Sequence, residues 1–299
     1  MNSLEIEAFL AIVDTKGISK AADKLYISQS TVSHRLNSLE NKIGETLIIR
    51  SKGIKEIRLT PKGNEFLSFA NRYMYLKKDI ATWKLNSAKY ELKVAGPICL
   101  NCYTLRDFYI SLIAKDYPLA LKINTNWDST IHNLLESYDL DIAITSRPRS
   151  LSSLISEPVF SEKLVMISDI RYSNYSQYVD ASTLDIRDEI YMNWGDNYKI
   201  WHNQIWNSLE LPKLTIDSPN LASFFLQDKE AWAIVPLSVA INLNSFKNLR
   251  ISMIYPAIPN RIIYKITQRE QSPASKKAIN IFEKELKEFL TNNNEIIKI

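Results

Sequence analysis

The chain has 299 residues, of which 45% are hydrophobic and 23% charged, and its formal net charge at pH 7 is +4. This length allows two or three domains with hydrophobic cores, and the composition is ordinary for a globular protein. The sequence has no apolar run of about 18 residues, no signal peptide and only two cysteines, so we expect a cytoplasmic protein without membrane spans.

Residues 1–60 carry the patterns of three short helices followed by a hairpin. Ser19 is placed to cap the second helix and Ser28 the third, while Gly44 is placed to end the third. Two short apolar runs around residues 52–53 then predict the hairpin.

The third helix has an outward face of short polar side chains where Lys and Glu are usual. A capped helix, a tight turn and a second capped helix form a helix-turn-helix, whose second helix reads base edges in the DNA major groove. Gln29 can hydrogen-bond adenine, and Arg35 can hold a guanine or a phosphate. The DNA-binding residues predicted here are Ser28, Gln29, Ser30, Thr31, Ser33, His34 and Arg35.

The hairpin is strongly basic. Between Arg50 and Gly63 there are five basic residues and one acid, a local charge of +4. Such a run can be a solvated surface hairpin, or a wing that lies on the DNA backbone. Beside a helix-turn-helix we favour the wing, with Arg50, Lys52 and Lys55 as further DNA contacts.

A long helix is predicted to begin at Thr60-Pro61 and to reach about residue 85, with Thr60 as its N-cap. Its apolar residues follow a 3-4-3-4-3 spacing, which is a heptad seam. The seam can pack on its own domain or on a partner helix, and we favour a partner. The residues predicted for dimerisation are Phe66, Phe69, Tyr73, Leu76, Ile80 and Trp83.

From Glu91 onward, strand-like runs alternate with helical patterns. This alternation predicts α/β layers with parallel strands and ligand crevices at the carboxyl ends of the strands. The predicted strands are residues 92–95, 119–125, 140–145, 164–168, 190–192, 214–216, 233–235 and 262–267.

Residues 1–70 resemble the N-terminal domain of the LysR-type transcriptional regulators. The matching stretches are "FLAIVDTKGISKAADKLYISQSTVSHRLNSLENKIGETLIIRS" and "LTPKG", and "LLESYDLDIAI" resembles a segment of the family's effector domain. The resemblance implies an α/β protein with an N-terminal winged helix-turn-helix, a long dimerising linker helix and a periplasmic-binding-protein-like effector domain of two α/β subdomains. It also implies ligand-responsive control of transcription, homodimers that often form homotetramers, and RNA polymerase as a candidate partner.

With this resemblance, the chain divides into three expected parts. Residues 1–60 are the winged helix-turn-helix domain, residues 61–88 the linker and dimerisation helix, and residues 89–299 the effector-binding domain. Subdomain I is expected at about 89–160 and 262–299, and subdomain II at about 161–261, with crossings near Ser146–Ser161 and Pro256–Arg261.

The effector site can be predicted only from topology, since the turns that follow strands would line a cleft between the subdomains. Trp194 can stack on a planar ligand or belong to the core, and Arg147 and Arg149 can hold a carboxylate or be hinge charges. The predicted effector-binding residues are Ile98, Cys99, Asn101, Asp128, Ser129, Thr130, Thr145, Ser146, Trp194 and Ser218.

Two alternatives to a ligand-responsive regulator remain. Cys99 and Cys102 form a CxxC after a strand, which could be a redox switch or simply line a cleft. The effector domain could also have lost its ligand, leaving a ligand-independent repressor. The sequence has no GxSxG, HExxH or Walker motif and no metal-ligand spacing, so we expect neither an enzyme nor a cofactor. The expected partners are double-stranded operator DNA and a small-molecule effector.

Overall fold

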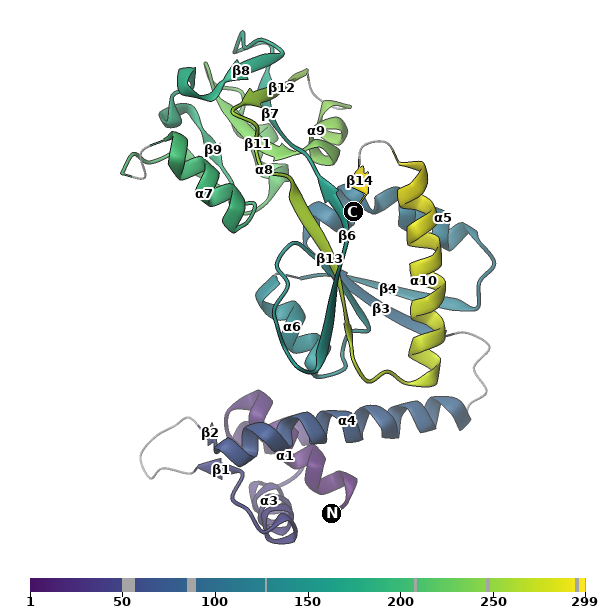
Figure 1. The fold of residues 1–299 in the computed structure, drawn as a ribbon. Coiled ribbons are helices and arrows are strands. Elements are labelled where there is room, and N and C mark those ends of the chain that lie inside the picture. The colour runs from purple at the N-terminus through teal and green to yellow at the C-terminus, as the bar shows by residue number, and fades with distance from the viewer. Residues whose placement is uncertain are drawn as a thin grey trace. The chain divides into compact units, whose positions relative to one another are not determined.

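The computed structural model describes the chain except residues 50–56, 85–89, 127, 207–208, 246–247, 294–295 and 299; of residues 82–83, 128–129 and 296–298 it describes the backbone alone. The chain forms two compact units, one of Met1–Ala88 with Glu136–Asp139 and one of Lys89–Leu135 with Leu140–Ile299 (Figure 1). We call them the N-terminal and the C-terminal unit. Within the described ranges, no helix combines the length and apolarity that a bilayer crossing requires.

The N-terminal unit is a three-helix bundle with a small hairpin and a long helix. Its elements are α1 (Ser3–Thr15), α2 (Ile18–Leu25), α3 (Gln29–Ile43), β1 (Ile48–Ile49), β2 (Arg58–Leu59) and α4 (Pro61–Lys84). Ile6, Phe9 and Ile12 of α1 and Leu36 and Leu39 of α3 are fully buried, so one apolar stripe from each helix makes the core.

The helix ends follow local chemistry, with one correction to the sequence analysis. Ser28 caps α3 by accepting a hydrogen bond from the Thr31 amide, and Gly44 ends it with φ 79°, as predicted. The prediction that Ser19 caps α2 was wrong, because Gly17 is the N-cap and makes no side-chain cap bond. Lys16 already closes α1 in the left-handed conformation, so α2 begins at Ile18, one residue earlier than a Ser19 cap would allow.

The C-terminal unit has two lobes, each built on its own sheet (Figure 1). The first lobe holds a six-stranded sheet in the order β14-β6-β13-β5-β3-β4. Its elements are β3 (Tyr90–Gly96), the π-helical turn η1 (Leu100–Thr104), α5 (Arg106–Ala114), β4 (Leu119–Thr125), α6 (Asp128–Glu136), β5 (Ile142–Thr145), β6 (Leu154–Glu162), β13 (Arg261–Gln268), α10 (Pro273–Asn292) and β14 (Ile296–Lys298).

The second lobe holds a four-stranded sheet in the order β11-β7-β12-β8 and a short β10-β9 pair. Its elements are β7 (Leu164–Asp169), β8 (Tyr178–Asp180), η2 (Ala181–Thr183), η3 (Ile186–Asp188), β9 (Ile190–Tyr191), α7 (Asp196–Ile205), β10 (Leu214–Thr215), α8 (Pro219–Phe225), β11 (Trp232–Pro236), α9 (Leu237–Asn244) and β12 (Leu249–Tyr255).

The α/β fold class was predicted correctly, but the expectation of parallel strands was wrong in part. β3 pairs in parallel with β4 and β5, whereas β13 runs antiparallel to β5 and β6, and β7 runs antiparallel to β11 and β12. The reason is visible in Figure 1, where β6 leads from the first lobe to the second and β13 returns beside it.

The strands also correct the expected first crossing between the lobes. Residues 154–162 are β6, a strand of the first sheet, so the chain leaves the first lobe after Glu162 and not within residues 146–161. It returns between Tyr255 and Arg261. The two crossing segments therefore lie at the ends of one antiparallel strand pair, which is a two-stranded hinge.

Candidate functional site

The exposed face of α3 begins at its N-terminus. Val32, Leu36 and Leu39 are fully buried, which fixes the opposite face toward solvent. That face brings together the predicted DNA-binding side chains: Ser28, Gln29, Ser30 and His34 are exposed, and Thr31, Ser33 and Arg35 are partly exposed. The Ser28 hydroxyl lies 2.7 Å from that of Thr31 and 2.8 Å from that of Ser30, so these three hydroxyls form one cluster at the helix start.

The hairpin next to α3 is held by contacts that the sequence analysis missed. Glu40 Oε1 accepts hydrogen bonds from the amides of Leu47 and Ile48 at 2.8 and 3.2 Å, which ties α3 to β1. A Cβ on Gly63 would lie 2.0 Å from the Leu47 carbonyl oxygen, so only glycine allows α4 to start this close to the hairpin. The predicted wing residues Arg50, Lys52 and Lys55 lie outside the described residues.

The predicted seam on α4 is apolar and largely exposed. Phe69, Tyr73, Leu76 and Ile80 have exposed fractions of 65%, 39%, 55% and 47%. Phe66 instead packs edge-on against Phe9 of α1, with ring centroids 5.3 Å apart, and the side chain of Trp83 lies outside the described residues. Four seam positions thus form a stripe that the rest of the described N-terminal unit leaves open.

In the C-terminal unit, a cavity of about 190 Å³ lies between the two lobes beside the hinge. Both lobes and the returning segment contribute to it, which is the arrangement expected of a ligand site at a domain interface. Its lining residues are Ser146, Pro148, Leu164, Trp194, Gly195, Asp196, Asn197, Tyr198, Pro259, Asn260, Arg261, Ile262 and Tyr264.

Two of the predicted effector residues line this cavity, Ser146 and Trp194. Trp194 is buried, its indole N–H donates to the Ile234 carbonyl at 2.7 Å, and its ring lies 5.2 Å from the Arg261 guanidinium carbon. The ring is therefore held in place as one wall of the cavity.

The other predicted effector residues are not part of the lining. Asn101 is buried, and its amide group donates to the Gly96 and Asn124 carbonyls and accepts from the Tyr109 hydroxyl, so it braces the first lobe. Thr145 is fully buried and accepts from the Arg147 amide. Ile98, Cys99, Thr130 and Ser218 are also outside the lining, and the side chains of Asp128 and Ser129 lie outside the described residues.

Arg261 is a charged lining residue that the sequence analysis did not predict as part of the site. Its side chain is 3% exposed, with Nη1 3.8 Å from Glu162 Oε2 and Nη2 donating to the Cys99 sulfur at 3.3 Å. Arg261 and Glu162 are paired in register at the ends of β13 and β6. A buried guanidinium needs such a counter-charge, so the hinge carries a buried ion pair.

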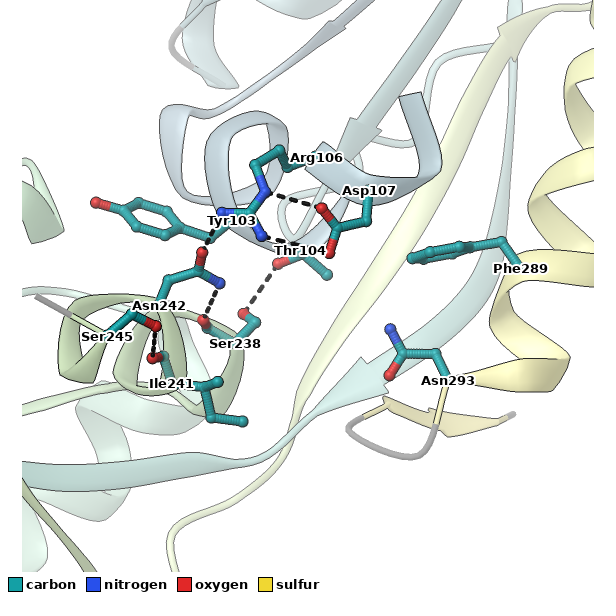
Figure 2. Close-up of a pocket in the computed structure, with 10 residues that line it drawn as sticks. All are labelled: Tyr103, Thr104, Arg106, Asp107, Ser238, Ile241, Asn242, Ser245, Phe289 and Asn293. Carbon is teal, nitrogen blue, oxygen red and sulfur yellow. Dashed lines mark hydrogen bonds and ion pairs between the residues drawn. The ribbon is translucent and has the colours of Figure 1, made fainter. Parts of the chain in front are cut away.

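Glu162 also joins the two lobes. Its Oε1 accepts hydrogen bonds from Thr104 of the first lobe at 2.5 Å and from Ser238 of the second lobe at 3.1 Å. Both hydroxyl-bearing residues line a second cavity, of about 180 Å³, on the α9 side of the hinge (Figure 2). Figure 2 also shows Arg106 reaching Asn242, a hydrogen bond of 2.5 Å between α5 and α9.

The two cysteines of the candidate redox pair differ in their exposure to solvent. Cys99 is buried beside Arg261, whereas Cys102 is exposed, and both are free thiols. Arg261 donates to the Cys99 sulfur, but reactive cysteines are usually partly exposed, and Cys99 is buried.

Comparison with known proteins finds relatives of the N-terminal unit and of most of the chain. Residues 4–64 match the model of the bacterial regulatory helix-turn-helix proteins of the LysR family. The HTH-type transcriptional regulator HdfR of Yersinia enterocolitica is 26% identical over 246 residues, which cover 79% of this chain and 81% of HdfR.

Two full-length structures share the fold. A variant of OxyR from Pseudomonas aeruginosa superposes with a TM-score of 0.66 and 17% identity, covering 96% of this chain and 94% of OxyR. LysG from Corynebacterium glutamicum, with arginine bound as effector, superposes with a TM-score of 0.64 and 15% identity, covering 96% and 99% of the two chains. Residues 4–64 thus match the LysR-family helix-turn-helix domain, and over most of its length the chain is similar to a curated transcription regulator and shares the fold of full-length OxyR and LysG.

Proposed function

We propose that α3 binds operator DNA in the major groove and that a small molecule in the cavity between the lobes controls this binding. The observation that carries the DNA part is the outward face of α3, where an amide, hydroxyls, an imidazole and a guanidinium replace the usual Lys and Glu. Those groups can hydrogen-bond base edges and phosphates, and operator DNA would place the protein in the cytoplasm.

The control by a ligand rests on the cavity beside the hinge. Side chains from both lobes line it, so a bound molecule contacts both and favours their closure. The arginine bound to LysG shows that a protein of this fold can hold a small effector. A ligand shifts the equilibrium only by its differential affinity for the two states, typically about 1–3 kcal/mol.

The test of this proposal is a thermal-shift screen of small molecules followed by operator binding with and without each hit. A stabilising molecule should change operator affinity at matched salt. If molecules that stabilise the protein leave operator affinity unchanged, the effector part of the proposal fails, and the chain acts as a ligand-independent repressor.

Self-association is part of the same proposal. The stripe of Phe69, Tyr73, Leu76 and Ile80 has the heptad spacing of a helix–helix seam. Pairing through two copies of α4 would give a two-fold dimer with two recognition helices for two half-sites. Tetramers and a contact with RNA polymerase belong to this proposal as further expectations from the family.

A thiol-based redox sensor is the second candidate, favoured by the hydrogen bond from Arg261 to the Cys99 sulfur. Treatment with a thiol oxidant should then change operator binding in a gel shift. Cys99→Ser and Cys102→Ser should each remove that response if the candidate is right, and a wild-type response from both variants would exclude it.

A further inference from the structure

Tyr26 stands out in the turn between α2 and α3. Its side chain is 95% exposed, and its φ of 55° lies in the left-handed region that side chains other than those of Gly, Asn and Asp rarely adopt. An aromatic residue at this position therefore gains no stability from burial of its ring, and its backbone conformation is unfavourable.

The turn holds this side chain outward. The Tyr26 amide donates to the Asp23 carbonyl at 3.2 Å, and the Ile27 amide donates to the Ala22 carbonyl at 3.1 Å. Ile27 packs against the core of the N-terminal unit, and Ser28 then caps α3. These bonds fix the backbone of the turn, and the ring that it carries is exposed to solvent.

The position of the turn suggests what the ring meets. In a helix-turn-helix the first helix crosses the DNA backbone while the N-terminal residues of the second enter the major groove. Tyr26 ends the first helix and precedes the cap of the second, so it occupies the junction where the phosphate strand passes. A phenol hydroxyl is one of the neutral donors that commonly contact phosphate oxygens.

We propose that Tyr26 is a backbone-positioning residue of the DNA interface, whose hydroxyl donates to a phosphate oxygen at the edge of the groove read by α3. This inference rests on the proposed function of α3. Because the phenol is neutral, its contact releases no counterion and carries no base information. It should therefore add affinity for every sequence equally.

The test uses the full chain and two duplexes, one enriched from a random library by the wild-type protein and one with the same bases scrambled. Tyr26→Phe should weaken binding to both duplexes by about three- to tenfold, which is the range for one lost hydrogen bond. The preference for the enriched duplex over the scrambled one should not change, and neither should the dependence of the binding constant on salt concentration. Tyr26→Asn should bind at least as weakly while melting at the same or a higher temperature, because asparagine suits the left-handed conformation.

Tyr178→Phe, which removes a largely exposed phenol from the C-terminal unit, should bind both duplexes as the wild type does. The inference is overturned if Tyr26→Phe binds like the wild type, if its loss is confined to the enriched duplex, or if Tyr26→Asn loses both affinity and thermal stability. The variant Arg35→Ala distinguishes a failure of the Tyr26 inference from a failure of the proposal that α3 reads DNA. If Arg35→Ala loses the preference while the Tyr26 variants change nothing, only the Tyr26 inference falls.

Discussion

At the scale of single residues, the chemistry of the α3 face follows directly from its sequence. The buried stripe of Val32, Leu36 and Leu39 decides which side chains point outward, so the exposed residues that we propose contact DNA could be predicted without coordinates. Arg261 could not be predicted this way. Its burial depends on the register of two strands that are about a hundred residues apart in the chain, and that register brings it to Glu162 and Trp194.

A first prediction concerns base reading by α3. Arg35→Ala and Ser33→Ala should weaken binding to the enriched duplex by about 1–3 kcal/mol each, because each removes a group able to contact a base edge. Fluorescence anisotropy at matched salt measures the affinity. Asn41→Ala, an exposed change farther along α3, is the control and should bind normally. Unchanged affinity of both test variants would remove α3 as the reading helix.

A second prediction concerns acid stability. Hydrogen bonds from Lys42 and Ser38 lower the pKa of Glu5 from 4.5 to about 2. The folded pKa is lowered, so this stabilisation is present above pH 4.5 and is lost as the pH falls toward 2.

Glu5→Gln should therefore melt below the wild type at pH 7, and the difference in Tm should shrink as the pH falls from 4.5 to 2. Calorimetry of both proteins across this range measures the difference. Glu45→Gln, at an exposed carboxylate, should show little difference at any pH. A difference between wild type and Glu5→Gln that stays constant with pH would contradict the assigned role of Glu5.

At the scale of elements, local pattern predicted the strands that are buried and regular. Residues 164–168 were predicted as a strand and lie in β7, every residue of which is buried. β6 was missed because its sequence contains Pro158 and four carboxylate or hydroxyl residues, two of them exposed and two buried. The pairing with β13 skips Val159 of β6 and places Pro158 opposite Tyr264, so the proline lies next to a bulge, where a strand tolerates it.

The third prediction belongs to α4. Leu76→Asp should place a charge in the proposed seam and split the dimer, because an unpaired buried charge is costly. Light scattering should then report half the wild-type mass. Ser68→Asp, on an exposed position of the same helix outside the seam, should keep the wild-type mass. If Leu76→Asp also keeps that mass, α4 does not form the dimer contact.

At the scale of the whole molecule, the C-terminal unit is two lobes joined by a hinge with a cavity on each side. Thr104, Ser238 and Glu162 link the lobes on the α9 side, while Trp194 and Ser146 line the other cavity. The alternating strand and helix patterns predicted α/β layers, and the resemblance to the LysR-type regulators implied the two lobes and two crossings. The sequence could not place the cavity, because the lining depends on how both crossings converge beside Arg261.

The fourth prediction tests that cavity. Trp194→Ala should abolish the change in operator affinity caused by a stabilising ligand from the screen, while leaving ligand-free operator binding nearly unchanged. The reason is that Trp194 forms a fixed wall of the cavity. Thr130→Val, outside the lining, is the control and should respond like the wild type. A normal response by Trp194→Ala would move the ligand site elsewhere.

The central claim is that α3 directs this protein to particular DNA sequences. Genome-wide occupancy of the full-length protein in its own cells, compared with that of Arg35→Ala at equal expression, tests it most directly. We expect discrete occupied sites that share a two-fold symmetric sequence and that are lost in Arg35→Ala. Occupancy without discrete sites, or the same sites in both proteins, would contradict the claim.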